Sequence, residues 1–251
     1  MDISFDNVSL NSGNYRVTRL KHEHSSQRES YSYELARERG SILIEGNFKS
    51  KDVVVEGRIS GSSKAELETN IDTLKEVLSR ASKNLDIEYS TGYRRYRNCM
   101  AVDIVVDRQY FHLSYAPFEV KFVIPSGVGE DTSNTVVTQT GVTVATNTNA
   151  VTIGGSTFPS PTVKITFASA TSVTQASLTI GGDKVTYDGT LVASDVLIFD
   201  LDNKKVTLNG IEKDYTGLFP KFVVGSNSYQ IITNGTAMNY SVEVSYKKKW
   251  L

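Results

Sequence analysis

Residues 53–81 read VVVEGRISGSSKAELETNIDTLKEVLSRA, a strand pattern that passes through a Gly/Ser turn into a helix pattern. Val53, Val55 and Ile59 alternate with more polar residues, which is the two-residue period of a half-buried strand. Ser63 and Glu66 have the spacing of a capping box, in which the hydroxyl and the carboxylate satisfy the first free amides of a helix. The stretch therefore predicts a strand that turns directly into a helix.

The predicted helix extends over residues near 64–82 and has one apolar face. The apolar residues recur at steps of three and four and form a single stripe: Leu67, Ile71, Leu74, Leu78 and Ala81. A single stripe predicts that the helix packs on one surface, and alternating segments on both sides supply a sheet for it. These segments are Ile42–Ile44, Leu85–Tyr89, Met100–Val106 and Phe118–Ile124. The first half thus reads β-β-α-β-β-β after a less regular segment up to about residue 39.

The charges divide the 251 residues into two parts. The chain has 27 Lys+Arg, 28 Asp+Glu and a net charge of −1, but all eleven arginines lie between Arg16 and Arg108. No residue between Asp131 and Lys164 is charged. We therefore expect a first domain at 1–125 and a second at 126–251, with the last few residues able to return to the first domain.

The second half is rich in strand and turn signals and has no helix pattern. Its expected strands are Pro161–Ala168, Ser177–Ile180, Lys184–Tyr187, Val196–Leu201, Lys205–Leu208, Lys221–Val224, Ser228–Thr233 and Tyr240–Tyr246. Many short strands of this kind indicate a β-sandwich or jelly roll. The Thr-rich stretch between Thr132 and Thr157 fits either a flexible connector or strands, and its alternating β-branched residues favour strands.

The composition excludes several classes of function. A neutral chain lacks the basic excess of a protein that binds DNA or RNA phosphates. No stretch approaches the roughly 20 apolar residues of a membrane span, and the N-terminus does not resemble a secretory signal. One cysteine, Cys99, excludes an internal disulfide framework and a zinc site with several thiolates.

The sequence contains no recognisable catalytic or metal-binding set. His22 and His24 have strand spacing for a shared metal but lack a third ligand nearby, and His112 lies among aromatic residues without a nucleophile or base. Cys99 follows several arginines, but a buried apolar role fits it better than a catalytic one. We therefore expect no enzyme activity, no catalytic or metal residues and no cofactor. A hydrolase with widely separated carboxylates remains the last alternative.

The most basic segment is the cluster formed by Tyr93, Arg94, Arg95 and Arg97. Interleaved tyrosines and arginines can clamp nucleic acid, can lie on a solvated hairpin, or can form a protein interface, where both residue types are enriched. Because the first half as a whole is neutral, a protein interface fits better than nucleic-acid binding. We predict that these four residues face a neighbouring subunit or partner.

The order of segments resembles that of the distal tail proteins of long, non-contractile-tailed bacteriophages. The resembling stretches are Arg39–Phe48, Val53–Ile59, Leu85–Tyr89, Tyr93–Tyr96, Ala116–Pro125, Phe158–Ile165, Leu197–Asp200, Val206–Gly210 and Tyr246–Leu251, with the apolar-striped helix between the second and third. The resemblance covers roughly residues 35–251 and consists of an ordered pattern of segments.

The resemblance implies a mainly β protein with two domains. The first would be a β-barrel or sheet domain with one helix, similar to tail-tube subunits, and the second a galectin-like β-sandwich. It further implies a structural virion protein at the tail tip, made in the host bacterial cytoplasm. Six copies would form a ring that joins the tail tube to the tail-associated hub protein and, in some phages, to a receptor-binding protein. The ring would leave a channel for DNA without binding nucleic acid specifically.

An alternative function is a carbohydrate- or cell-wall-binding module of a tail or prophage particle. Sugar-binding galectins use a His, Asn and Arg set with a stacking Trp, whereas residues 126–251 contain no Arg or His and have Trp250 only at the extreme end. The galectin-like site is therefore not expected, although sites built on Tyr, Asp and Asn stay open. The short spacing also leaves little room for the long arm that some relatives insert.

Overall fold

The structure is a computed structural model, and it describes residues 1–22, 28–34, 41–109, 114–171, 173–235 and 237–251. The chain divides into two compact units. The first comprises Met1–Thr132 together with Leu251, and the second comprises Ser133–Trp250. The division falls after Thr132, beyond the composition change near residue 125.

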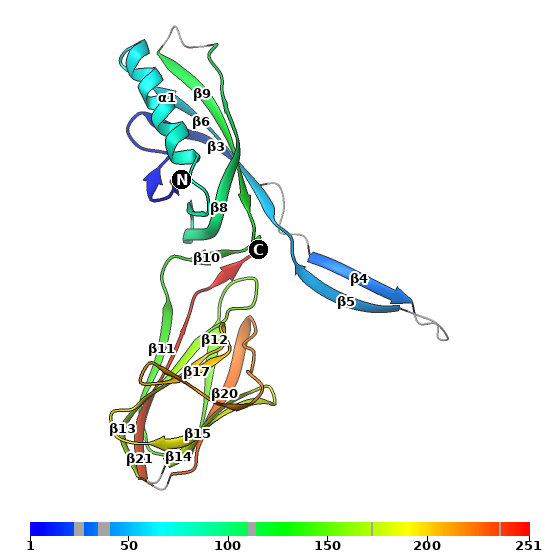
Figure 1. The fold of residues 1–251 in the computed structure, drawn as a ribbon, viewed down its shortest axis with the longest axis vertical. Helices are drawn as coiled ribbons and strands as arrows, with labels where there is room; N and C mark the ends of the chain where they lie inside the picture. Colours follow the sequence, from blue (N-terminus) through cyan, green and yellow to red (C-terminus); the bar gives the residue numbers. More distant parts are fainter. Residues whose placement is uncertain (23–27, 35–40, 110–113, 172, 236) are drawn as a thin grey trace. The chain divides into compact units, whose positions relative to one another are not determined.

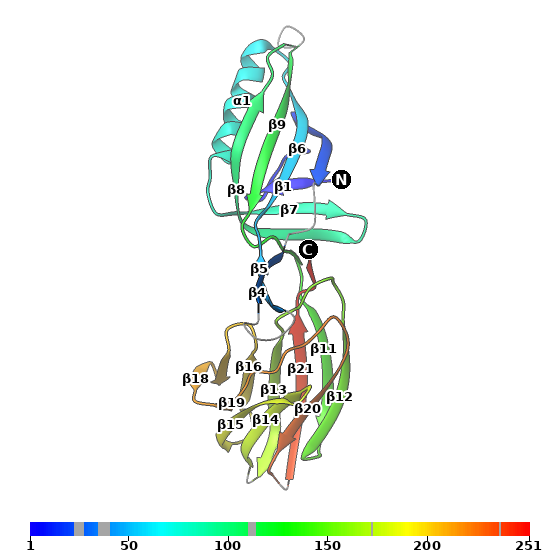
Figure 2. The same ribbon diagram turned by 90° about the vertical axis from the view of Figure 1, so that its right-hand side faces the viewer.

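The first unit is built on one antiparallel sheet and one helix (Figures 1 and 2). Its sheet runs in the order β2-β1-β7-β8-β9-β6-β3, and β10 pairs with β8. The elements are β1 (Ile3–Phe5), β2 (Val8–Ser9), β3 (Tyr15–His22), β6 (Lys51–Ser60), α1 (Lys64–Leu78), β7 (Lys83–Tyr89), β8 (Gly92–Val106), β9 (Tyr115–Ile124) and β10 (Gly129–Asp131). Strand β8 is long enough to pair with β7 in its first part and with β9 in its second.

Helix α1 begins as the capping box predicts, with one difference. Ser63 Oγ accepts a hydrogen bond from the Glu66 amide at 3.2 Å, but the Glu66 carboxylate accepts from the Ser62 amide at 2.7 Å rather than from Ser63. The helix ends at Leu78, earlier than residue 82, because the chain turns at Ser79 and Ser82 has a positive φ of 56°.

The core of the first unit lies between α1 and the sheet. The buried residues of the helix are Leu67, Ile71, Leu74, Val77 and Leu78. They pack with the alternate residues of β6 and β9, such as Val55 and Val120, which pair across the two strands. Gly57 pairs with Phe118, and a Cβ at residue 57 would lie only 2.4 Å from the Phe118 ring. A glycine is therefore required there for the ring to cover the strand.

Strands β4 (Arg28–Glu34) and β5 (Ser41–Phe48) form a separate two-stranded sheet (Figure 1). Their register shifts between Arg28 and Ser30, which marks a bulge. The Tyr31 and Tyr33 side chains on β4 are 52% and 59% exposed. This hairpin thus presents large aromatic surfaces outside the core.

The second unit is a sandwich of two antiparallel sheets (Figure 2). One sheet has the order β11-β21-β13-β16-β17-β18, and the other has the order β12-β20-β14-β15-β19. The strands of these two sheets are β11 (Thr135–Val142), β12 (Thr146–Ile153), β13 (Thr162–Thr171), β14 (Val173–Ile180), β15 (Asp183–Leu191), β16 (Val196–Asp200), β17 (Lys205–Leu208), β18 (Ile211–Lys213), β19 (Thr216–Gly217), β20 (Gly225–Thr233) and β21 (Ala237–Tyr246). The short strand β22 (Lys249–Trp250) follows β21 and belongs to neither sheet. Inward residues of both sheets form one core, among them Phe167 and Tyr240 of the first sheet and Leu178 and Ile231 of the second.

The strand interpretation of the Thr-rich stretch is confirmed, because β11 and β12 occupy it. The strand expected at Lys221–Val224 is wrong. The Asn227 side chain accepts from the Val223 amide at 2.8 Å and donates to the Val223 and Gly225 carbonyls. These bonds satisfy the backbone groups of Val223 without a partner strand, and Phe222 is the buried residue of the segment.

Candidate interface site

The four residues predicted to form an interface lie in the first part of β8. This part of the strand is paired on both sides, with β7 and with β10. Because side chains alternate along a strand, Tyr93, Arg95 and Arg97 share one face, and Arg94 lies on the other. The sequence cluster therefore divides into two groups with different surroundings.

Arg95 is held by a carboxylate on the neighbouring strand. Its guanidinium donates to both oxygens of Asp86 at 2.8 Å, and Asp86 is the residue opposite Arg95 in the β7–β8 register. The two side chains are 28% and 14% exposed. Bidentate pairing with Asp86 raises the pKa of Arg95, so the guanidinium stays charged. This pair fixes the register of the two strands and leaves Arg95 little capacity for another partner.

Arg97 and Tyr93 are more accessible members of the same face. The Arg97 guanidinium donates to Glu130 on β10 at 2.5 Å while its side chain stays 58% exposed. Tyr93 is 39% exposed, and its hydroxyl donates to Asp2 at 3.3 Å. Desolvation and the Asp2 charge raise the pKa of Tyr93. These two side chains are therefore the ones that a neighbour can reach.

The opposite face of β8 carries aromatic and cationic groups packed together. Arg94 lies over the Tyr89 ring at 4.3 Å, and Lys51 lies over the Tyr96 ring at 4.9 Å. The Tyr89 and Tyr96 hydroxyls are 3.1 Å apart. Burial, with a smaller effect of the nearby Arg94 charge, lowers the pKa of Lys51, and burial raises the pKa of Tyr89. This stack joins β6, β7 and β8 from inside the unit.

The arrangement balances charge rather than concentrating it. Asp86 and Glu130 neutralise Arg95 and Arg97, so the exposed face is mixed in charge instead of a basic stripe. A mixed face that includes an exposed Tyr and Arg matches the rim and anchor chemistry of a protein interface. It lacks the unpaired cations that a phosphate backbone requires. The interface role of these four residues stays a prediction.

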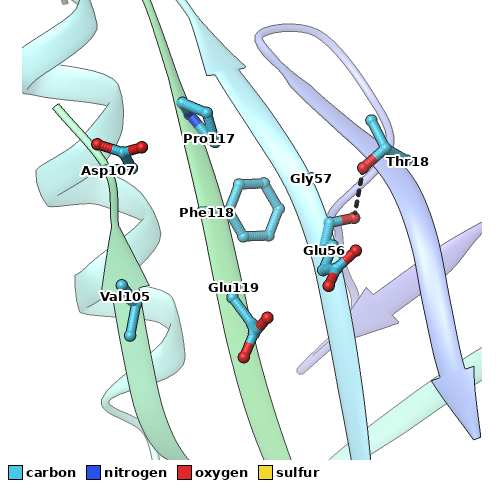
Figure 3. Close-up of a pocket in the computed structure, with 8 residues that line it drawn as sticks. All are labelled: Thr18, Glu56, Gly57, Val105, Asp107, Pro117, Phe118 and Glu119. Carbon is cyan, nitrogen blue, oxygen red and sulfur yellow. Dashed lines mark hydrogen bonds between the residues drawn. The ribbon is translucent and has the colours of Figure 1, made fainter. Parts of the chain in front are cut away.

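A shallow depression lies on the sheet of the first unit, between β3, β6, β8 and β9 (Figure 3). Its lining residues are Thr18, Glu56, Gly57, Val105, Asp107, Pro117, Phe118 and Glu119. Glu56 and Glu119 both pair with Lys21, the latter at 3.5 Å, and the hydrogen bond from Lys21 lowers the pKa of Glu56. A lowered pKa is the opposite of what a general acid needs, so Glu56 does not suit that role.

The other candidates from the sequence are the histidines and Cys99. No group of three or more His, Cys, Asp or Glu side chains is placed there to hold a metal ion. His24 and His112 lie outside the described residues. Cys99 is buried, and burial raises the pKa of its thiol to about 12. No described helix has the length and apolar character needed to cross a membrane.

The exposed tyrosines of the β4–β5 hairpin were not foreseen from the sequence. The alternation of Tyr31 and Tyr33 with serines is a strand signal, but it does not show that the strand stands apart from the main sheet. The pairing pattern was needed to recognise these side chains as candidate contact residues.

Comparisons with known proteins define the class of this fold. Residues 154–250 match the family model of the siphovirus-type tail component, C-terminal domain. No curated protein sequence matches the chain. The match covers most of the second unit, so the sandwich is similar to this tail-component domain.

The whole chain is similar to the Dit protein of phage SPP1, whose crystal structure is described as a paradigm of the hub adsorption apparatus in phages that infect Gram-positive bacteria. The TM-score is 0.72 at 11% sequence identity, with 100% of this chain and 99% of that chain covered. Chains from the phage p2 baseplate in its activated conformation, with Sr or Ca, match 96% of each chain at 12% and 11% identity, with TM-scores of 0.43 and 0.40.

The resemblance to distal tail proteins is thus confirmed, and so is the fold class. The protein is mainly β, with a sheet-and-helix unit followed by a sandwich, as in the SPP1 Dit structure. The matches support a structural role among tail-tip components.

Proposed function

We propose that this chain is a ring-forming adaptor at the distal end of a siphophage tail. Six copies of the first unit form a closed ring that leaves a channel for DNA. The ring links the tail tube on one side to the tail-associated hub protein and host-recognition proteins on the other. The chain is made in the bacterial cytoplasm, acts in the virion and performs no catalysis. Tyr93, Arg94, Arg95 and Arg97 belong to a contact surface of the ring or of a partner.

The observation that supports the ring best is the β4–β5 hairpin. It forms a sheet of only two strands and exposes Tyr31 and Tyr33. A two-stranded hairpin is marginally stable in water by itself, so it gains most by packing on another surface. In a closed ring, the contacts are head-to-tail, and one element of each copy packs on a different surface of the next. The hairpin has the exposure and the aromatic side chains for this role.

A carbohydrate-binding module is less well supported. The second unit has five tyrosines, and four of them are buried: Tyr187, Tyr229, Tyr240 and Tyr246. The ring of the remaining one, Tyr215, packs edge-on against Phe219 at 4.8 Å. The tyrosines of the sandwich thus offer few faces on which a sugar ring could stack, and the most exposed aromatic side chain is that of Phe158, at 56%. Saturable binding on a glycan array would support this alternative.

The ring is tested by native mass spectrometry and negative-stain imaging of the full chain at rising concentration. We expect a closed six-membered ring for the wild type. Replacing Tyr31 and Tyr33 by Ser removes the exposed aromatic contacts without touching the core, and we expect this variant to shift toward monomers. Tyr215→Ser is the matched control, because Tyr215 is an exposed tyrosine of the second unit.

A wild-type chain that stays monomeric at high concentration, alone and with tail-tube and hub proteins, would overturn the proposed function. If the double Tyr variant forms rings as well as the wild type does, the proposed ring stands, but the hairpin is not part of its interface.

A further inference from the structure

The sandwich has four edge strands, and three of them are protected against pairing with another chain. Strand β19 has two residues, and β18 has three, including Glu212 and Lys213. Strand β11 is longer, but its register shifts between Gln139 and Val142. Short length, charge and bulges are the devices by which proteins protect sheet edges.

Strand β12 has none of these devices. Its eight residues pair with β20 without a register shift, from Thr146 opposite Ile232 to Ile153 opposite Gly225. It contains no charge and no proline, and it lies within the uncharged stretch between Asp131 and Lys164. Among the described strands, β12 pairs with β20 alone.

The hydrogen-bond pattern shows which backbone groups point away from the sheet. The Thr233 amide donates to the Ala145 carbonyl at 2.8 Å, so residue 145 is a hydrogen-bonded partner of β20. Bonded and non-bonded pairs alternate along antiparallel strands. The odd residues of β12 therefore bond to β20. The even residues direct their N–H and C=O groups outward, and their side chains are exposed: Thr146, Thr148, Ala150 and Thr152.

One end of this outward row is already closed. The Tyr246 hydroxyl donates to the Thr152 carbonyl at 3.0 Å. The open positions are therefore Thr146, Thr148 and Ala150. Three alternate residues with free backbone donors and acceptors form a template for an added strand.

The side chains beside this template determine what kind of strand it accepts. On β20, the residues opposite the three open positions are Ile232, Gln230 and Ser228, and Gln230 donates to the Thr148 hydroxyl at 3.0 Å. A charged side chain on an incoming strand would find no opposite charge on either strand. An uncharged strand with hydroxyl or β-branched side chains fits the edge, because such cross-strand pairs are favourable.

We infer that the β12 edge is a docking site for an extended, uncharged strand from a different polypeptide of the tail tip. The choice of a different polypeptide rests on the proposed ring. Copies in a ring are related by rotation about its axis, whereas two identical edges can pair only across a two-fold axis. Neighbouring copies in the ring therefore cannot pair their β12 edges with one another, and the three other sandwich edges carry the protective features described above.

The test uses the full chain and a labelled, acetylated and amidated peptide of alternating Thr and Val with a lysine at each end. Binding is followed by fluorescence anisotropy. Thr148→Pro removes one outward N–H and keeps the β12–β20 bonds, since edge strands tolerate a proline whose nitrogen faces solvent. Thr148→Val keeps the N–H and is the matched control. We expect wild type and the Val variant to bind, and the Pro variant to bind about tenfold more weakly.

Hydrogen exchange provides a readout that does not depend on the variants. We expect the amides of Thr146, Thr148 and Ala150 to exchange rapidly in the free chain and to become protected with peptide. Those of Asn147 and Asn149 should be protected in both states. The same peptide N-methylated at alternate residues lacks the N–H groups on one edge, and we expect it to give no protection.

Equal affinity of the Pro variant, or unchanged exchange with saturating peptide, would overturn the inference. So would wild-type self-association that Thr148→Pro abolishes, because the occupant would then be a second copy. Ring formation is measured on the same samples. If the chain forms rings but does not bind the peptide, only the inference about β12 is overturned. If the chain stays monomeric but binds the peptide, the ring is overturned and strand addition at β12 is supported.

Discussion

Strands β7–β8 and β11–β12 are positioned by different chemistry. In the first unit, the bidentate pair between Asp86 and Arg95 fixes the register. In the second unit, the Gln139 side chain exchanges hydrogen bonds with Asn147 across the two sheets, and Asn149 also donates to Gln139. In the first unit, these charged side chains pair with one another. In the second unit, neutral amide side chains position strand β12, so the outer edge of β12 presents backbone groups and no charged side chain.

The largest expected effect concerns Cys99, which lies where β8 leaves β7 to pair with β9. Burial raises the pKa of its thiol from 9.0 to about 12. The native thiol should therefore react with a disulfide reagent at least about tenfold more slowly at pH 8 than the unfolded one. The thiolate is the nucleophile, and its smaller fraction outweighs the higher intrinsic nucleophilicity of a thiolate with a raised pKa. Stopped-flow absorbance in buffer and in urea measures both rates.

The same pKa difference predicts that the free energy of unfolding falls as the pH rises. The unfolded thiol loses its proton first as pH rises, so the fold loses stability between about pH 9 and 12. Rapid native reaction at the unfolded rate would show that the interior beneath β8 is open to solvent.

The Asp86–Arg95 pair should contribute the next largest effect. Replacing Asp86 by Ala leaves a half-buried guanidinium without its partner, and we expect the free energy of unfolding to fall by about 2 kcal/mol. Urea denaturation measures it. The control is Glu212→Ala, which removes an exposed pair with Lys205 and should cost less than about 0.5 kcal/mol. Equal losses for both variants would mean that the pair does not fix the register.

The amide contact of the second unit should contribute less and should not depend on salt. Asn147 is 6% exposed, and replacing it by Ala should lower the free energy of unfolding by about 1 kcal/mol. In 1 M salt we expect this loss to persist, while a charge-based loss shrinks through screening. Thr146→Ala, on the exposed face of the same strand, is the control. A salt-dependent loss for Asn147→Ala would contradict the distinction between the two units.

Periodicity was sufficient to predict most elements, because burial on one face leaves a direct pattern in the sequence. It located helix α1 and the alternating strands β6 and β9, and it favoured strands in the Thr-rich stretch. It failed at Lys221–Val224, where an apolar run is stabilised by the Asn227 side chain instead of a partner strand. Hydrophobic periodicity does not show such a side-chain to backbone hydrogen bond, although Asn227 is only four residues from Val223.

The candidate sites could be predicted less well than the fold, because they depend on the register of paired strands. The cluster at Tyr93–Arg97 is visible as a sequence, but only the pairing of β7 with β8 shows that Arg95 is already engaged by Asp86. The uncharged stretch is also visible, but which of its amides point outward follows from a single bond between Thr233 and Ala145. Neither fact can be read from residue types, because both depend on which residues of distant strands are opposite one another.

The smallest expected effect is on DNA. A chain with net charge −1 offers few counterion-releasing contacts, and several of its described cations are paired. On the first-unit sheet Lys21 pairs with Glu56 and Glu119, and Lys121 pairs with Asp52. We expect no saturable binding of duplex DNA at physiological salt, by anisotropy. This outcome suits a ring that DNA must pass, because strong attraction to phosphates would hold the DNA back. A tight complex that weakens steeply with salt would show instead that unpaired cations dominate the surface, which the ion pairs of the first unit argue against.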